Sequence, residues 1–255
     1  MTVADFNRAV RLTKSLAGYE LLTQRKESFL GLVWPLLQAG GLLLAFNLFR
    51  GDAGGLEIIL STYLGVLVWT TASTVLISNL RILPANRELI THIAFPHAIL
   101  SVVDVSVKYL FFVAQVLVGV AVWLAVVPNE HWPLVLAYVP IYLLAFYLAL
   151  LAMAWMASII GAALPDLSFL LPPVLLLLLA LSPVFQRTAE GMSWAVRILN
   201  EINPLSLWVD AFYATIGIAQ AGPAAPFVFL AAALASVVLA RYLITMCYRE
   251  ITKVI

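Results

Sequence analysis

Charged residues are scarce in this chain of 255 residues, and their scarcity decides its class. Only 11% of the residues are Asp, Glu, Lys or Arg, whereas 64% are hydrophobic. A soluble domain carries about 25% charged residues, so this chain has too few to cover a surface that faces water. Lipid is therefore the expected solvent for most of the protein, and helices are expected to satisfy the backbone within it.

Cysteine, histidine and phosphate-binding motifs are also scarce, which excludes several kinds of site. The single cysteine, Cys247, allows no disulfide framework and no thiolate metal site within one chain. The histidines, His92, His97 and His131, lack metal-ligand spacing, so no metal is expected. Without a G-x-x-x-x-G-K-[ST] loop, ATP and magnesium would have to be bound by another polypeptide. The net charge of +1 gives no basic field for nucleic acid.

Long apolar runs, by contrast, recur along the chain and predict six transmembrane helices. About 20 apolar residues suffice to cross the hydrocarbon core. The predicted spans cover residues 29–49, 56–80, 98–127, 133–163, 167–185 and 227–246. The fourth is longer than needed, which predicts a tilt or a break. Because no internal repeat or linker is found, residues 1–255 are expected to form a single domain.

Residues 1–28 predict an amphipathic helix at the membrane interface. Val3, Phe6 and Val10 recur on one face at helical spacing, with Arg8 and Arg11 on the opposite side. The apolar face is modest, so a helix lying on the membrane is favoured over a spanning one, and an ordinary polar helix is the alternative. The segment has no early apolar core, which argues against a signal peptide.

Residues 186–222, between the fifth and sixth spans, predict two short re-entrant helices. Apolar helical stretches lie at 194–199 and 207–218, but neither is a good span. The segment also contains five charged residues: Arg187, Glu190, Arg197, Glu201 and Asp210. Asn203 and Pro204 form the expected corner between the two helices. The predicted fold class is thus an all-α membrane protein with six spans, an interfacial N-terminal helix and this external pair.

Positive charges predict the orientation of the chain. Six spans place both termini on one side, together with ten Lys or Arg residues: Arg8, Arg11, Lys14, Arg25, Lys26, Arg81, Arg87, Arg241, Arg249 and Lys253. Only Arg50, Arg187 and Arg197 lie on the other side. Because positive residues favour the cytoplasmic side, both termini and residues 81–97 are expected in the cytoplasm. Residues 186–222 are then expected outside the cytoplasmic, or inner, membrane.

Asp104 and Lys108 are the only charged pair inside a predicted span. They are four residues apart on one helix face and can therefore pair. One interpretation is a proton or ion relay, and the other is a structural pair near the cytoplasmic boundary, which we favour. A secondary transporter usually needs buried ionisable residues near mid-membrane, which the other spans do not offer.

Aromatic residues offer candidates for a path that carries sugars, because sugar C–H faces stack on aromatic rings. The candidates are Trp34, Phe46, Tyr63, Trp69 and Phe185. Membrane-interface belts and core packing are the alternatives, and they are favoured for each residue taken singly.

The interval 84–92 predicts a short cytoplasmic helix that could dock into a groove on a soluble partner. It begins at Pro84, Asn86 could cap it, and Arg87, Glu88 and Leu89 could project from it. A plain loop is the alternative. His92 ends the interval.

Several segments resemble ABC-2 type permeases that export polysaccharides, in particular the O-antigen exporters, with capsule and teichoic-acid permeases as relatives. The segment 25–35, RKESFLGLVWP, resembles the family's entry into its first span. Residues 79–96, Leu181-Ser182-Pro183-Val184-Phe185 and Asn203-Pro204-Leu205 resemble three later family segments in the same order. One departure is that Pro165 precedes Asp166 where the family often has Arg-Asp, so the role of that arginine is not carried over.

The resemblance implies the partners and the cargo. Two copies would form a channel between them, two ABC-type ATPase subunits would dock below, and the segment 84–92 would be the coupling helix. The cargo would be a polysaccharide linked through pyrophosphate to a polyprenyl lipid. Cations near the cytoplasmic boundary could hold the pyrophosphate, namely Arg8, Arg11, Lys14, Arg25 and Lys26. The two outer helices would gate the mouth, with Trp194, Asn203, Pro204 and Trp208 as gate residues.

Three other functions stay open. The first is an ABC-2 permease for a drug or a small lipid. The second is an intramembrane enzyme that modifies a lipid-linked glycan, although no catalytic set is found in the sequence. The third is a secondary transporter driven by an ion gradient.

Overall fold

The computed structural model describes five stretches of the chain, namely residues 55–87, 97–127, 132–185, 194–218 and 224–254. It also describes single positions before them: Gly18, Leu37, Gly40, Gly41 and Leu44. Within these parts, side chains are described except at His97 and beyond Met246. The predicted interfacial helix at 1–28 and the predicted first span at 29–49 therefore lie almost wholly outside the described residues.

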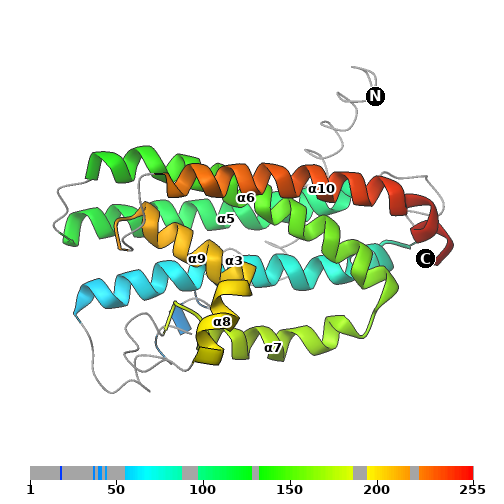
Figure 1. Ribbon diagram of the computed structural model, residues 1–255, viewed down its shortest axis with the longest axis horizontal. Helices are drawn as coiled ribbons and strands as arrows, with labels where there is room; N and C mark the ends of the chain where they lie inside the picture. The colour runs from blue at the N-terminus through cyan, green and yellow to red at the C-terminus, as the bar shows by residue number, and fades with distance from the viewer. Residues whose placement is uncertain are drawn as a thin grey trace.

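All regular structure in the described stretches is α-helical, and the long helices lie side by side in a bundle (Figure 1). In chain order the helices are α3 (Leu56–Ala85), α5 (His97–Val126), α6 (Trp132–Ala163), α7 (Leu167–Leu181), α8 (Trp194–Ile202), α9 (Pro204–Thr215) and α10 (Ala225–Val254). Four of them, α3, α5, α6 and α10, are long and apolar enough to cross a membrane. They coincide with the predicted second, third, fourth and sixth spans.

Helix α7 is shorter than the span that the sequence predicts at 167–185. It ends at Leu181, and Ser182 then takes an extended conformation. Its 15 residues measure about 22 Å at 1.5 Å per residue, whereas the hydrocarbon core is about 30 Å thick. The described residues thus contain four helices of spanning length, and the predicted count of six is not confirmed.

Helix α3 is the central helix of the bundle. It packs against α5, α6, α7 and α9. One side of it is fully buried and carries Leu64, Val68, Ala72 and Val75. The sequence predicts the end of this span at residue 80, but the helix continues to Ala85. The segment that follows it is correspondingly shorter than expected.

Small residues let α6 approach its neighbours closely. A Cβ atom at Gly161 would overlap the backbone of Leu80, so α6 touches α3 there with no side chain between them. On another side of α6, Ala145 and Ala149 form a buried cluster with Ala233 of α10. Close backbone approach at small residues is the usual means of packing helices in lipid. Helix α6 therefore holds α3 and α10 together.

Val184, which follows α7, and Tyr213 of α9 pack against the side of α3. Val184 and the hydroxyl of Tyr213 both contact Gly65, and Tyr213 donates a hydrogen bond of 3.2 Å to the carbonyl of Ser61. Gly65 is nine residues from the start of α3 at Leu56, or about 14 Å along its axis. Figure 1 shows α8 crossing between the end of α7 and the start of α9. That these helices dip into a bilayer stays a prediction.

Candidate functional site

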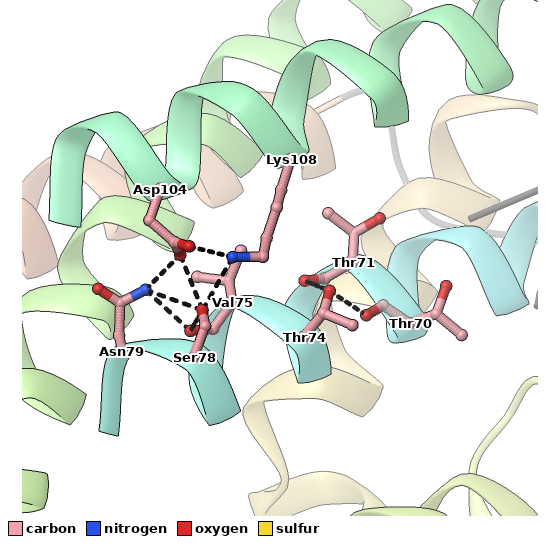
Figure 2. Close-up of polar contacts among 8 residues, drawn as sticks. All are labelled: Thr70, Thr71, Thr74, Val75, Ser78, Asn79, Asp104 and Lys108. Atoms are coloured by element: carbon pink, nitrogen blue, oxygen red, sulfur yellow. Dashed lines mark hydrogen bonds and ion pairs between the residues drawn. The ribbon is translucent and has the colours of Figure 1, made fainter. Parts of the chain in front are cut away.

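A cluster of four polar side chains links α3 to α5 within the bundle (Figure 2). Lys108 and Asp104, one turn apart on α5, form the ion pair that their spacing predicts. From α3, Ser78 Oγ and Asn79 Nδ2 each donate to Asp104 Oδ2, in both cases at 2.8 Å. Lys108 Nζ also donates to Ser78 Oγ at 2.9 Å. The sequence analysis predicts the pair but misses both α3 partners.

These contacts lower the cost of holding two charges inside an apolar bundle. The side chains of Asp104 and Lys108 are only 20% and 25% exposed. A charge at the bilayer centre costs roughly 2.5–3.5 kcal/mol on insertion scales, and pairing with added hydrogen bonds offsets part of that. The partners from α3, Ser78 and Asn79, do not ionise. The geometry therefore favours a structural pair that joins two helices over a proton relay.

The amide oxygen of Asn79 is an unusual atom of this cluster. Asn79 is fully buried, and its Nδ2 group donates to Asp104 and to the carbonyl of Val75. Its Oδ1 atom, however, has no hydrogen-bond partner among the described residues. A buried polar atom left unpaired costs about 1–3 kcal/mol, and such atoms commonly bind water. The cluster therefore has the chemistry of a hydrated site.

A row of hydroxyl groups continues from the cluster along α3, and we call it the hydroxyl row. It consists of Thr70, Thr74 and Ser78, which are four residues apart and so line one side of the helix (Figure 2). All three are partly exposed, unlike the apolar side of α3 that faces the core. A search for charged residues alone misses this row. The hydroxyl-rich run at 70–74 is the sequence signal that reveals it.

The expected coupling segment is only partly described. Pro84 lies inside α3, so it does not begin a separate helix. Asn86 is the C-cap of α3: its backbone N–H donates to Leu83, and its side-chain amide donates to the carbonyl of Ile82 at 2.8 Å. Arg87, the residue after it, is again helical, so the expected role of Asn86 as the cap of a following helix stays a prediction. Arg87 is exposed and helical, whereas Glu88, Leu89 and His92 lie outside the described residues.

The expected gate residues lie in three kinds of surroundings. Asn203 is the N-cap of α9, where its side chain accepts from the N–H of Leu205, and Pro204 is the first residue of α9. The predicted corner between two short helices is thus confirmed. Trp194 on α8 is 77% exposed. Trp208 packs edge-on against Phe146 of α6, with ring centroids 5.8 Å apart.

The aromatic path candidates differ in their surroundings. Trp69 of α3 is buried in the core of the bundle. It therefore has no open surface, which fits the packing alternative. Tyr63 and Phe185 are partly buried and pack against the same core. Trp34 and Phe46 lie outside the described residues. So do the five candidate cations for a pyrophosphate, namely Arg8, Arg11, Lys14, Arg25 and Lys26.

Arg81 of α3 contacts the first turn of α7. Its guanidinium donates to the carbonyl of Ser168 at 3.1 Å and lies over the ring of Phe169, 4.8 Å from the centroid. Arg81 thereby ties the end of α3 to the beginning of α7.

These helices, four of them long and apolar enough to cross a membrane, define a multi-pass α-helical membrane protein. The model of the ABC-2 type transporter family matches residues 11–217, and the chain belongs to that family. The chain is therefore a membrane permease, the transport component with which ABC-type ATPases generally work. A comparison with curated protein sequences finds no match.

Proposed function

We propose that this permease exports a polysaccharide linked through pyrophosphate to a polyprenyl lipid, and that a separate ATPase drives it. Membership of the ABC-2 family supports the transport role. The observation that favours a polar cargo is the hydroxyl row with the Asp104–Lys108 cluster at its end. An apolar cargo would not need a surface that forms hydrogen bonds. The ordered motifs at 25–35, 79–96, 181–185 and 203–205 favour the polysaccharide exporters within the family.

The working unit that we propose is two copies of this chain with two ATPase subunits, placed in the inner membrane with both termini in the cytoplasm. The chain has no phosphate-binding loop, so ATP and magnesium are held by the partner. The partner docks on the segment that follows the cap of α3, with Arg87, Glu88, Leu89 and His92 as contacts. Arg87 is exposed just beyond the C-cap of α3, which supports this, because movement of the docked segment would be transmitted to the central helix.

The two ends of the path have different tasks in this proposal. Cations of the N-terminal segment, Arg25 and Lys26 among them, hold the pyrophosphate at the cytoplasmic side. Helices α8 and α9 gate the outer side. The contacts of Tyr213 of α9 with Gly65 and Ser61 support that role, because they connect α9 to the central helix.

Deletion of the gene tests the cargo. We expect lipid-linked polymer to accumulate in the cytoplasm and surface polysaccharide to be lost, with both restored by the intact gene. Normal surface polysaccharide in the deletion strain would contradict the proposal, and altered drug resistance in that strain would favour the drug-permease alternative. Turnover of lipid-linked glycan by the purified chain alone would favour the enzyme. Transport driven by a proton gradient without ATP would favour the secondary transporter.

Replacing Arg87, Glu88 and Leu89 together with glycine tests the docking segment. We expect ATP hydrolysis to lose its coupling to export, because glycine removes the contacting side chains and weakens the helix. The measurements are ATPase activity and export in membranes that contain both subunits. The same triple change at residues 250–252, near the end of α10, is the control. Full export by the first variant would refute the assignment.

A further inference from the structure

The chemistry of the hydroxyl row defines what can lie against it. Thr70 Oγ1 donates to the carbonyl of Val66 at 2.8 Å, and Thr74 Oγ1 donates to the carbonyl of Thr70 at 2.8 Å. A hydroxyl has one proton and two lone pairs, so both threonines have used their proton within the helix. What they present outward is lone pairs. This part of the row can therefore accept hydrogen bonds but cannot donate them.

The other end of the row offers a donor. Lys108 has three N–H groups, of which one meets Asp104 and one meets Ser78. A third N–H is left over in the contacts that the described residues make. A ligand that spans the row must therefore donate to Thr70 and Thr74 and also accept near Lys108. A sugar hydroxyl does both, whereas an anion such as pyrophosphate only accepts, and Asp104 would repel it.

A partner that can donate hydrogen bonds suits the row better than lipid does. Acyl chains offer no hydrogen-bond donors, so lone pairs that face them stay unpaired at a cost. The exposed side chains of α10, such as Val228, Leu234 and Val238, show what the protein places on an apolar open face. At the end of the row, the partly exposed ion pair of Asp104 and Lys108 adds charge that acyl chains cannot solvate.

We propose that Thr70 and Thr74, with Lys108 at the end of the row, form a contact site for the hydroxyl groups of the exported glycan. This rests on the proposed function, because it assigns that cargo a place on the central helix. The site binds the sugar part of the cargo and not its pyrophosphate. It favours hydroxyl-rich chains of any sequence, since a row of lone pairs along one helix face carries little information on sugar identity.

The first experiment compares Thr70→Val/Thr74→Val with Thr70→Ser/Thr74→Ser in the full chain with its ATPase partner. Valine keeps the shape of threonine without the oxygen, and serine keeps the oxygen. We expect the valine pair to lower the rate of glycan export roughly tenfold, because it removes two neutral hydrogen bonds, while the serine pair retains most of it. Ser236→Val on α10, which removes a hydroxyl bonded to its own helix, should not change export. Equal export by the valine and serine pairs would overturn the proposal.

The second experiment tests the site without measuring export. Cysteine is placed at 70 or 74 in a Cys247→Ser background and treated with N-ethylmaleimide, which needs a thiolate and therefore water at the sulfur. We expect labelling at both positions and none at Val118→Cys, which is on the apolar exposed side of α5. Labelling should slow in cells that make lipid-linked glycan, relative to cells in which its assembly is blocked. Absence of labelling, as contact with a second copy would produce, would overturn the proposal.

The two experiments separate this inference from the function on which it rests. If the deletion strain exports its glycan normally, the proposed function fails whatever the cysteines show. Suppose instead that the deletion strain accumulates glycan in the cytoplasm, while the valine pair exports at the normal rate and labelling is the same with and without glycan. In that case only the contact site fails.

Discussion

Helices α3 and α10 have the same length and are both able to cross a membrane, yet they meet different surroundings. In its most apolar 18-residue stretch α3 is 61% buried, whereas α10 is 17% buried. Toward its middle, α3 leaves the hydroxyl side chains of residues 70–74 partly exposed near an ion pair, with Leu56 and Ile58 exposed at its start, while the large open surface of α10 is mainly apolar. In a membrane protein, exposure alone thus says little. The chemistry of the exposed side tells whether lipid or something polar lies against it.

A hydroxyl bonded to its own helix does not by itself distinguish the two helices. Ser236 of α10 donates to the carbonyl of Ala232 just as Thr74 of α3 donates to Thr70. Such back-bonding is common for Ser and Thr in helices. The difference lies in grouping, since α3 repeats the hydroxyl over successive turns beside Asp104 and Lys108, and Ser236 stands among aliphatic neighbours.

The largest effect that we expect comes from Gly161→Val, which separates α6 from the central helix. The new side chain would overlap the backbone of Leu80, which cannot move aside as a flexible side chain can. Overpacking of this kind costs about 3 kcal/mol or more. The measurement is the yield and thermal midpoint of the purified protein in detergent. Leu234→Ala on the open face of α10 is the control and should change the midpoint little; equal effects would contradict the central place of α3.

A smaller effect is expected from Lys108→Ala, which leaves Asp104 charged and poorly exposed. Removing one partner of a buried pair costs about 3–5 kcal/mol, and partial exposure should reduce that to about 2 kcal/mol here. The double variant Asp104→Ala/Lys108→Ala removes both charges and should recover part of the loss. The thermal midpoints of both variants measure this. A double variant less stable than Lys108→Ala would show that the hydrogen bonds of Asp104 to α3 matter more than charge balance.

The smallest effect on stability is expected from Thr74→Val. Its hydroxyl bonds only to its own helix, at Thr70 and Thr71, so its loss should change the free energy of unfolding by less than about 0.5 kcal/mol. Ser236→Val should behave alike. A clearly lower thermal midpoint for Thr74→Val alone would mean that the hydroxyl row stabilises the fold, and its proposed role toward cargo would lose its rationale.

The parts of the fold that the sequence predicts well are those governed by local composition. The spans around α3, α5, α6 and α10 are apolar for long enough that no competing structure is available in lipid. The Asp104–Lys108 pair follows from helical spacing alone, and the corner at Asn203 and Pro204 follows from capping chemistry. The sequence does not define the end of α3 sharply, because Pro84 and the cap at Asn86 are both compatible with a helix end.

The candidate site could be predicted only in part. Spacing shows that Thr70, Thr74 and Ser78 share a helix face, but it does not show which faces of α3 are covered. The role of Asn79 depends on α5 lying against that turn of α3. Trp69 was a path candidate by type, and only packing shows it to be buried.

By itself, the sequence determined that this protein is helical and resides in a membrane, because an apolar run of about 20 residues satisfies its backbone hydrogen bonds in lipid within a single helix. The tertiary structure alone decided that α3 is central and that the hydroxyl row on it stays partly exposed. The reason is that burial is a property of neighbours: Gly161, Tyr213 and Asp104 come from three other helices and together define which side of α3 is closed.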